Sequence, residues 1–479
     1  MEIDGTSGEG TESTEAPIGD DGPRGPWQGR VRWAPGGGLA YTPGVVLVRS
    51  EVLDAARGLL ARVLERDEVR VEPILGGRWG RIVDIPDPLE AIQELARVGV
   101  VAQVDHVLFA TCCCPPHPGD PSAAPFYANP FYANAVGEGS FAANPFYANP
   151  FYANAGSGGC CCGCRGGGAF ANPFYANPFY ANATESPFAA RSTQESGRRR
   201  SSARPAEAPD GVEYPVPERP VRIAVLDTGY AEAFKPSGLE PRLTLSGGDR
   251  PSEDGDGYLD PAAGHGTFIA GLIEQLVPGC EIEVIEVLST YGDGKETNIA
   301  TRLSELAART DPGPPHVVNL SFGTYSPFRM SLLEDAIGDL REKGTVVVAS
   351  AGNDGSCAPL YPAAFEHVVG VAALVEDEGA AAPFTNYGPW VDACTAGVDL
   401  VSTFFEGWNG DEPEVDGTDV DRFDGWAVWS GTSFAAPRVV AALAAHMVKE
   451  NTSAGKAAAA LIEHESVERR PMLGAVVVP

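Results

Sequence analysis

VRIAVLDTG, at residues 221–229, is almost entirely apolar up to Asp227, which is typical of a strand that is buried on both faces. HGTFIAGLIEQL, at residues 265–276, has apolar residues at helical spacing. Strand and helix patterns of these two kinds alternate through the rest of the chain. The sequence therefore predicts an α/β domain over residues 213–479, with a parallel sheet covered by helices on both faces.

The other strands and helices of this domain are predicted from the same two patterns. The expected strands are EIEVIEVLS (281–289), HVVNLSF (316–322), TVVVASA (345–351) and HVVGVAAL (367–374). The expected helices are TNIATRLSELAAR (297–309), SLLEDAIGDLREKG (331–344) and SFAAPRVVAALAAHMVKE (433–450). In such sheets, functional residues collect at the carboxyl ends of the strands.

Three polar residues stand at such strand ends or helix starts. Asp227 follows an apolar strand, and His265 and Ser433 open helices. A serine hydroxyl becomes a good nucleophile when a neighbouring base takes its proton, and histidine is suited to that role. A carboxylate can hold the imidazole in the correct tautomer. These residues are candidates for nucleophilic catalysis.

An attack by Ser433 on a carbonyl would create an oxyanion that needs hydrogen-bond donors. The backbone N–H of Ser433, at a helix start, is one candidate. The side-chain amide of Asn353, in the glycine-containing turn Ser-Ala-Gly-Asn-Asp-Gly, is a second candidate.

Five short motifs together resemble the subtilisin-like serine proteases, the subtilase family, over about residues 214–450. They are Asp-Thr-Gly, His-Gly-Thr, Asn-Leu-Ser-Phe-Gly, Ala-Gly-Asn and Gly-Thr-Ser-x-Ala-x-Pro. The resemblance implies a serine endopeptidase that works through an acyl-enzyme, with Asp227, His265 and Ser433 as the triad and Asn353 in the oxyanion hole. It also implies that the backbone grips the substrate as an added strand at Ser321, Phe322, Gly323, Ala349, Ser350, Ala351 and Gly352.

Three positions depart from the family pattern. Phe268 stands where a second histidine is frequent, Thr395-Ala396 stands where Ala-Pro is usual, and Arg438 stands where histidine is frequent. These departures bear on substrate preference and on the charge at the rim of the site.

A small domain is expected at residues 43–111, after a disordered acidic lead at residues 1–42. Its pattern is β-α-β-β-α-β, which suggests a ferredoxin-like α+β sandwich. In pattern and position it resembles the inhibitor-type propeptides of subtilases. That resemblance implies an intramolecular inhibitor whose last strand, near Val107 to Thr111, plugs the active cleft. An unrelated small domain is the alternative.

Residues 112–212 form a low-complexity linker, which we expect to be disordered. Pro-Phe-Tyr-Ala-Asn occurs there six times, in tandem pairs that begin at Pro125, Pro145 and Pro173. The repeats could be an inert spacer, docking motifs for a partner, or cleavage substrates of the attached enzyme. A basic cluster, Arg198 to Arg204, is a candidate for a maturation cut.

Cysteine is concentrated in the linker. Seven of the ten cysteines lie at 112–114 and 160–164, where, with His117, they could bind a soft metal or be redox-labile. Cys280, Cys357 and Cys394 are expected to be buried apolar side chains.

The charge balance limits the possible partners. Asp plus Glu number 65 against 34 for Lys plus Arg, which gives a formal net charge of −31 and makes nucleic acid an unsuitable partner. The sequence shows neither an apolar run of membrane-spanning length nor a signal-peptide pattern, so a cytoplasmic location without membrane contact is expected. No cofactor is required. Asp254, Asp256 and Asp260 could bind calcium or form a solvated acidic loop.

The sequence as a whole predicts a precursor of an endopeptidase that acts on peptides or proteins and carries its own inhibitor. Two alternatives remain open: a catalytically silent scaffold whose repeats recruit partners, and a self-processing precursor that releases Pro-Phe-Tyr-Ala-Asn peptides.

Overall fold

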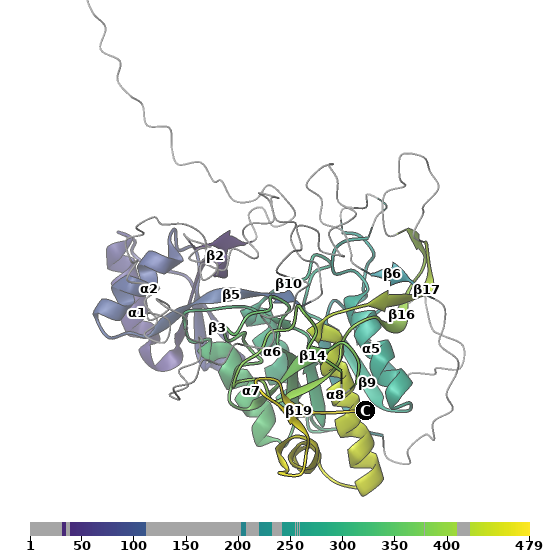
Figure 1. The fold of residues 1–479 in the computed structure, drawn as a ribbon. Helices are drawn as coiled ribbons and strands as arrows, with labels where there is room; N and C mark the ends of the chain where they lie inside the picture. The colour runs from purple at the N-terminus through teal and green to yellow at the C-terminus, as the bar shows by residue number, and fades with distance from the viewer. Residues whose placement is uncertain are drawn as a thin grey trace, which may run out of the picture.

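The computed structural model describes two packed domains, which Figure 1 shows side by side. The described residues are 31–34, 39–111, 203–206, 220–231, 242–253, 255, 257, 259–377, 379–409 and 422–479. The Pro-Phe-Tyr-Ala-Asn repeats, the two cysteine runs and His117 lie outside these residues.

The N-terminal domain is an antiparallel sheet with two helices on one face. Its elements are β1 (Arg32–Trp33), β2 (Ala40–Arg49), α1 (Leu53–Val63), β3 (Val71–Ile74), β4 (Trp79–Ile82), α2 (Pro88–Arg97) and β5 (Ala102–Ala110). The sheet order is β5-β2-β4-β3. This is the predicted β-α-β-β-α-β arrangement. Within the N-terminal domain, β2 lies at the centre of the sheet and β5 lies at its edge.

The expected boundary at residue 43 is wrong. β1 pairs with β2, with Arg32 opposite Tyr41, so the N-terminal domain already includes residues that we assigned to the acidic lead. Asp87 caps the start of α2, because its side chain accepts a hydrogen bond from the N–H of Glu90 at 3.0 Å.

The C-terminal domain is built on a parallel sheet, which confirms the predicted fold class. Its strands run in the order β19-β15-β14-β13-β11-β7-β9-β8, with β18 antiparallel at the edge. They are β7 (Arg222–Asp227), β8 (Arg242–Ser246), β9 (Glu281–Glu286), β11 (Val317–Leu320), β13 (Val346–Ser350), β14 (Val368–Leu374), β15 (Ala393–Ala396), β18 (Arg469–Arg470) and β19 (Gly474–Val476).

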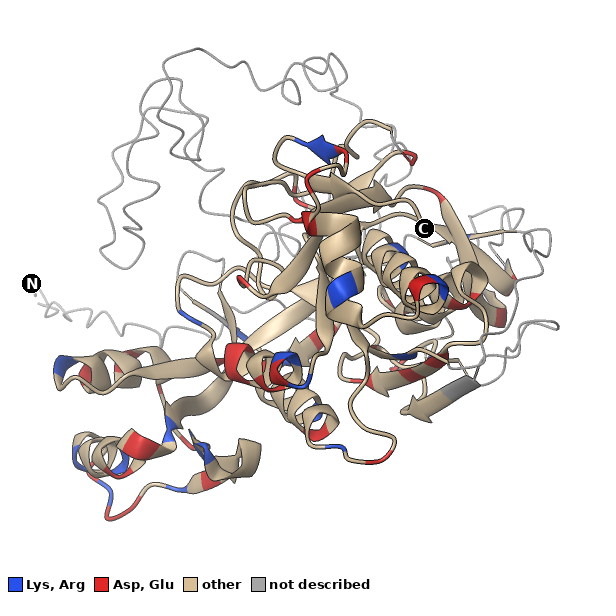
Figure 2. Ribbon diagram, turned by 90° about the horizontal axis from the view of Figure 1, so that it is seen from below, with Lys and Arg blue, Asp and Glu red and all other residues tan. Residues whose placement is uncertain are grey.

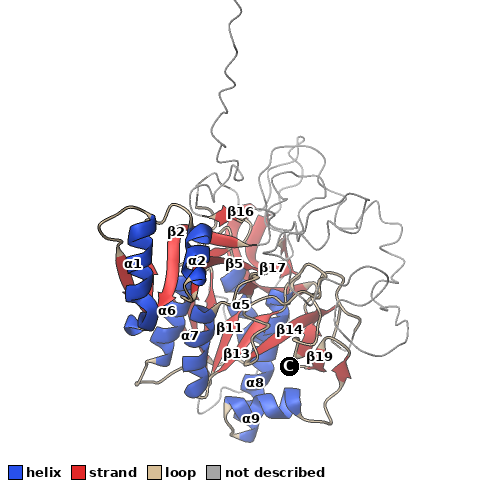
Figure 3. Ribbon diagram, turned by 90° about the vertical axis from the view of Figure 1, so that its left-hand side faces the viewer, coloured by secondary structure: helices blue, strands red, loops and turns tan. Residues whose placement is uncertain are grey.

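Helices cover both faces of this sheet. The helices α5 (His265–Leu276) and α8 (Thr432–Glu450) pack with Val225 on one face. The helices α6 (Glu296–Ala307) and α7 (Ser331–Glu342) pack with Ala224 and Leu226 on the other. Figure 3 shows α6 and α7 on the side that faces the N-terminal domain. A short helix, α9 (Ala454–Ala458), follows α8.

A second, antiparallel sheet lies beside α5. It consists of β16 (Leu400–Asn409), β17 (Arg422–Trp429) and β6 (Arg204–Pro205). Because β6 pairs with β17 and Arg204 forms an ion pair with Asp399 at 2.8 Å, the C-terminal domain begins before residue 213. The predicted boundary at residue 212 is therefore too late.

The central strands carry few charged residues, which lie mostly on the helices and the outer strands and loops (Figure 2). Within the described residues, no helix is both long and apolar enough to cross a bilayer. Burial of the cysteines is confirmed for Cys280 and Cys394, and desolvation raises the pKa of each thiol to about 12. The expected burial is wrong for Cys357, which is only half-buried.

Candidate active site

The candidate residues meet at the carboxyl edge of the parallel sheet, where the strand order reverses. β7 has β9 on one side and β11 on the other, which is the topological switch point of such sheets. Asp227 ends β7, Ser321 follows β11, and Ser350 ends β13. His265 and Ser433 lie in the first turns of α5 and α8, which begin beside this edge.

Asp227 and His265 form a fully buried pair. His265 Nδ1 lies 2.7 Å from Asp227 Oδ1, which also accepts the N–H of Thr228 at 2.9 Å. A carboxylate at Nδ1 favours the tautomer with the proton there, so Nε2 keeps its lone pair. Among the described residues, no group forms a hydrogen bond with His265 Nε2, which leaves that atom able to accept a proton.

The Ser433 side chain is fully buried beside Thr111. Its Oγ forms hydrogen bonds with the carbonyl oxygen of Ser321 at 3.1 Å and with Thr111 Oγ1 at 2.7 Å. The ring of Phe434, the next residue, lies 5.2 Å from the His265 ring. Within the described residues, no hydrogen bond joins Ser433 Oγ to His265 Nε2.

Asn353 presents an amide to the carbonyl group of Thr111. Its Nδ2 donates to the Thr111 carbonyl oxygen, and its Oδ1 accepts from both the N–H and the hydroxyl of Thr432 at 2.9 Å. These bonds fix which end of the amide faces Thr111. A Cβ at Gly431 would lie 3.1 Å from the same carbonyl oxygen, so glycine keeps this pocket open.

The end of β5 occupies the cleft as an added strand. β5 pairs antiparallel with β10 (Asp293–Lys295) on one side and with β12 (Phe322–Gly323) on the other. Ala110 donates to the Gly292 carbonyl at 2.8 Å, and Thr111 donates to the Ser321 carbonyl at 3.2 Å. The last strand of the N-terminal domain therefore places the Thr111 carbonyl against Asn353 and the Thr111 hydroxyl against Ser433.

The side chains of this strand enter separate subsites. Leu108 is fully buried in an apolar cluster that includes Leu288 and Met330. Ala110 lies against Gly292, where an added Cβ would come within 3.2 Å of the Ala110 Cβ. Thr111 Oγ1 forms a hydrogen bond with Ser350 Oγ.

The predicted substrate walls divide into two groups. Ser321, Phe322, Gly323 and Ser350 contact β5, as described above. The other three form hydrogen bonds inside the C-terminal domain: Ala349 pairs in β13, the Ala351 carbonyl accepts from Asn386 at 2.8 Å, and the Gly352 N–H donates to Thr432 at 3.0 Å. They hold the loop that carries Asn353.

The N-terminal domain also caps two helices of the C-terminal domain. Gln103 Oε1 accepts the N–H of Ser331 at 2.9 Å at the start of α7. The Asp105 carboxylate accepts the N–H and the hydroxyl of Thr297, each at 3.0 Å, at the start of α6. Helix N-termini carry unsatisfied N–H groups and partial positive charge, so these contacts stabilise the docked state. Burial raises the pKa of Asp105.

Glu296 links these two caps. Its buried carboxylate accepts from Gln103 Nε2 at 3.0 Å and from the N–H of Leu333 at 3.0 Å, and it lies 2.5 Å from His106 Nδ1. His106 Nε2 lies 3.0 Å from the hydroxyl of Ser326. This network was not predicted from the sequence, because His106 and Glu296 lie 190 residues apart in the chain.

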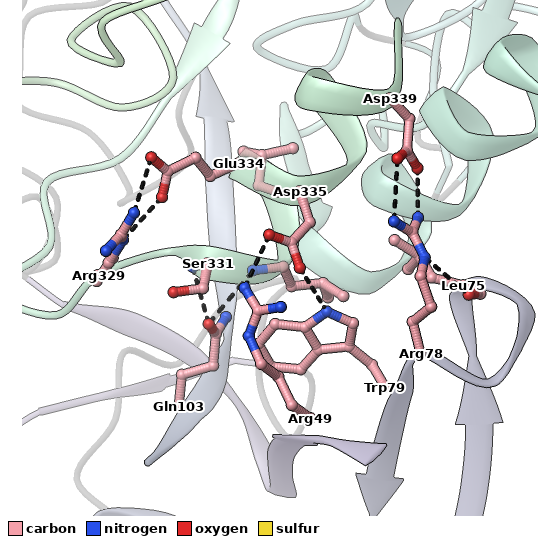
Figure 4. A network of polar contacts seen from close by, with 12 residues as sticks. Arg49, Leu75, Arg78, Trp79, Gln103, Arg329, Ser331, Glu334, Asp335 and Asp339 are labelled. Carbon is pink, nitrogen blue, oxygen red and sulfur yellow. Dashed lines mark hydrogen bonds and ion pairs between the residues drawn. The ribbon is translucent and has the colours of Figure 1, made fainter. Parts of the chain in front are cut away.

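Arginine and tryptophan side chains extend the interface at its rim (Figure 4). Arg78 forms a two-point ion pair with Asp339. Asp335 accepts from Trp79 Nε1 at 3.0 Å and from Arg49 at 2.8 Å, and the Arg49 guanidinium lies 5.0 Å from the Trp79 ring centroid. The acidic face of α7 thus matches basic residues of β2 and of the turn before β4.

Asp249 is a positioning residue that was not predicted from the sequence. It is buried and accepts from the N–H of Gly264 at 3.1 Å, from the Thr228 hydroxyl at 3.0 Å and from the Thr267 hydroxyl at 3.1 Å. These bonds join the end of β7 to the start of α5, and so fix Asp227 relative to His265. Burial raises the pKa of Asp249 well above its usual range.

The departures from the family pattern have structural explanations. Phe268 is fully buried and packs against Phe434, with ring centroids 4.6 Å apart, so it lies beneath the site and not at its rim. One nitrogen of Arg438, Nη2, lies 2.8 Å from both carboxylate oxygens of Asp377, and the Thr395 hydroxyl donates to the same carboxylate at 3.3 Å. Two of the departures therefore belong to one network.

Of the three calcium candidates, only Asp260 lies among the described residues. Asp254 and Asp256 lie outside the described residues. Asp260 Oδ2 accepts from the N–H of Glu253 at 2.7 Å and from the Thr290 hydroxyl, so this oxygen already has two hydrogen-bond donors within the protein. Within the described ranges, no three His, Cys, Asp or Glu side chains are grouped to hold a metal ion.

Replacing Asp249 should destabilise the C-terminal domain. Asp249→Asn replaces one carboxylate oxygen with an NH₂ group, which cannot accept from the surrounding hydroxyls, so we expect a loss of about 1–3 kcal/mol in the free energy of unfolding. Urea unfolding measured in a Ser433→Ala background checks this, and an unchanged midpoint would contradict it.

The same variant should show a pH-dependent penalty. Because the pKa of Asp249 is higher in the folded chain, this carboxyl contributes stability that is full in acid and is lost as the pH rises through the folded-state pKa. The difference in unfolding free energy between the parent chain and Asp249→Asn should therefore be largest in mild acid, near the usual carboxyl pKa of about 4, and smaller at higher pH. A difference that grows with pH would contradict this assignment.

Comparison with known proteins agrees with the geometry. The family model described as "Subtilase family" matches residues 218–473. The chain is 33% identical over 243 residues to the thermophilic serine proteinase of Bacillus sp. (strain AK1), covering 48% of this chain and 53% of that protein. It is 33% identical over 193 residues to subtilisin Savinase of Lederbergia lenta, covering 38% and 66%. The chain thus spans between about half and two thirds of the length of these relatives.

Solved structures include a similar chain, described as a cold adapted subtilisin-like serine proteinase. It has 22% identity and a TM-score of 0.41, and the match covers 57% of this chain and 93% of that one. The family model accounts for more than half of the present chain and includes the strand ends and helix starts that form the pocket. This chain therefore belongs to the subtilase family.

Proposed function

We propose that this chain is a serine endopeptidase made as a precursor, with Asp227, His265 and Ser433 as its catalytic triad. The observation that carries this proposal is the position of the Thr111 carbonyl. That carbonyl accepts from Asn353 Nδ2, and Thr111 Oγ1 lies 2.7 Å from Ser433 Oγ, while β5 is held as an added strand. A peptide bond gripped in this way is positioned for attack.

The reaction assigns one role to each side chain. His265 Nε2 takes the proton of Ser433 as Oγ attacks the Thr111 carbonyl carbon, and Asp227 stabilises the imidazolium. Asn353 donates to the oxyanion of the tetrahedral intermediate, together with the backbone N–H of Ser433. His265 then protonates the nitrogen of Cys112 as the Thr111–Cys112 bond breaks. Water, activated by His265, releases the acyl group from Ser433.

The N-terminal domain acts as the inhibitor of the precursor. After the Thr111–Cys112 bond is cut, the new Thr111 carboxylate stays in the cleft, because the pairing of β5 with β10 and β12 does not depend on that bond. The helix caps at Ser331 and Thr297 hold the domain in place. This geometry favours Thr111–Cys112 as the first maturation cut over the basic cluster that ends at Arg204, a residue of β6.

The substrates are peptides or proteins, bound as a strand between β10 and β12. The cytoplasmic location stays a prediction, as does the absence of nucleic-acid and membrane partners. A catalytically silent scaffold remains the alternative, and the next test separates it from an enzyme.

Catalytic competence predicts a specific self-cleavage. The wild-type chain should react with a fluorophosphonate probe at Ser433 and yield a fragment that begins at Cys112, whereas Ser433→Ala should do neither. Ser466→Ala, an exposed serine near the end of the chain, is the matched control and should behave as wild type. Asn353→Ala should keep the probe site but lower kcat by about 10²–10³-fold. Intact mass and terminal mapping provide the measurement, and an unlabelled wild-type chain would favour the silent scaffold.

The helix caps predict how tightly the cleaved inhibitor stays bound. Gln103→Ala leaves the Ser331 N–H without its partner and removes one donor from the buried Glu296 carboxylate, so the cleaved domain should dissociate about 10–100-fold more readily. Gln93→Ala, on α2 of the same domain, is the control and should have no such effect. The measurement is the rate at which peptidase activity appears after cleavage. Equal rates for the two variants would argue against capping as the source of affinity.

A further inference from the structure

The strand in the cleft and the linker repeat share one pattern of side chains. The cleft holds Leu108-Phe109-Ala110-Thr111, and each repeat carries Phe-Tyr-Ala-Asn. Both segments consist of a large apolar residue, an aromatic residue, alanine and a small polar residue, in that order. The four residues that lie in the cleft can therefore be aligned, position by position, with a four-residue sequence that occurs six times in the same chain.

We propose that Phe-Tyr-Ala-Asn is the second substrate of this cleft, cut after asparagine wherever alanine follows. This inference rests on the proposed function and names the substrate class of the same site. The six copies divide equally by the residue that follows them. Alanine follows Asn134, Asn154 and Asn182, whereas proline follows Asn129, Asn149 and Asn177.

The alanine position lies opposite a glycine of the C-terminal domain. Ala110 donates its N–H to the carbonyl of Gly292, and a Cβ added to Gly292 would lie 3.2 Å from the Cβ atoms of both Ala110 and Ala262. Gly292 has no side chain, and this leaves room for the Ala110 methyl group. We expect a larger substrate side chain to fit less well beside Gly292 and Ala262. Every Phe-Tyr-Ala-Asn copy has alanine there.

The next position suits a small polar side chain. Thr111 Oγ1 forms hydrogen bonds with the hydroxyl groups of Ser350 and Ser433. Asparagine is similar in length and carries both a donor and an acceptor, so its amide can bond to Ser350 Oγ. A hydroxyl group that lines a subsite selects for polar partners, because an apolar residue would leave it unpaired.

The two remaining positions accept large side chains. Leu108 belongs to an apolar cluster that includes Leu288 and Met330. Such apolar surroundings also suit a phenylalanine side chain. Phe109 pairs through its backbone with Gly323 and is only half-buried, so its subsite tolerates tyrosine, whose hydroxyl can reach solvent.

A following proline would protect three of the copies. The proline ring places a carbon on the leaving nitrogen, the atom that His265 must protonate, and removes its N–H. It also restricts the backbone of the preceding asparagine. In the three copies followed by alanine, Ser433 forms an acyl-enzyme with the asparagine carbonyl, the alanine nitrogen leaves with a proton from His265, and water releases the asparagine carboxylate.

The cuts define a set of products. After the Thr111–Cys112 bond is cut, the repeats remain joined to the C-terminal domain through Ala203, so their cleavage is intramolecular. The expected fragments are 112–134, 135–154 and 155–182, each of which ends in asparagine. The cysteine runs fall in the first and the last of these fragments.

The test is terminal mapping of every fragment from the purified full chain and four variants, one of which is Ser433→Ala. Wild type should give new ends at Asn134, Asn154 and Asn182. Ala135→Pro should abolish the cut after Asn134 only, and Pro130→Ala should create a cut after Asn129. Ala133→Leu should slow the cut after Asn134 by about tenfold or more, because the larger side chain should fit less well opposite Gly292. These three substitutions lie in the linker, outside the described residues.

The outcomes separate this inference from the proposed function. Probe labelling and a Cys112 end with all three Asn–Ala bonds intact would overturn the repeats as substrates and leave the enzyme assignment standing. Cutting at Asn–Pro bonds, or undiminished cutting in Ala135→Pro, would also overturn it. Asn–Ala cuts that persist in Ser433→Ala would show that another protease makes them, which would likewise overturn it. Absence of labelling, of the Cys112 end and of these cuts would overturn both proposals.

Discussion

The hydrogen bond from Asn353 Nδ2 to the Thr111 carbonyl is the contact on which the arrangement of this molecule depends. It is formed only because one strand, β5, belongs to two sheets. Its first half pairs with β2 inside the N-terminal domain, and its second half pairs with β10 and β12 of the C-terminal domain. The continuous strand fixes where the Thr111 carbonyl lies against the C-terminal domain, and we propose that this makes the docked domain both substrate and inhibitor.

Buried polar contacts make that docking specific. Gln103, Asp105, His106 and Glu296 are all removed from solvent, and each has a partner across or within the interface. Such groups are costly to bury without partners, so a shifted register would leave several of them unsatisfied. The register of β5 is thereby fixed, and with it the identity of the residue at Ser433. The rim contacts of Arg78 and Arg49 add charge complementarity with α7.

Much of the fold could be predicted from the sequence because it is encoded locally. The apolar runs that end in Asp227 and Ser350 have the pattern of doubly covered parallel strands, and the helix that begins at His265 follows from its own periodicity. The interface could not be predicted, since Glu296 and His106 are ordinary residues in their own segments and gain their role only by meeting. The same holds for Asp249, whose loop shows no motif. The boundaries at residues 43 and 212 were missed because β1 and β6 are two-residue strands that only their pairing reveals.

The central claim is that the chain cuts itself at the bond its own fold places on Ser433. The direct measurement is the rate of Thr111–Cys112 cleavage as a function of protein concentration, followed from the moment of refolding. An intramolecular reaction is first order, so the account predicts a rate constant that does not change over a dilution of about a hundredfold. A rate that rises in proportion to concentration would show that one molecule cuts another and would contradict the account.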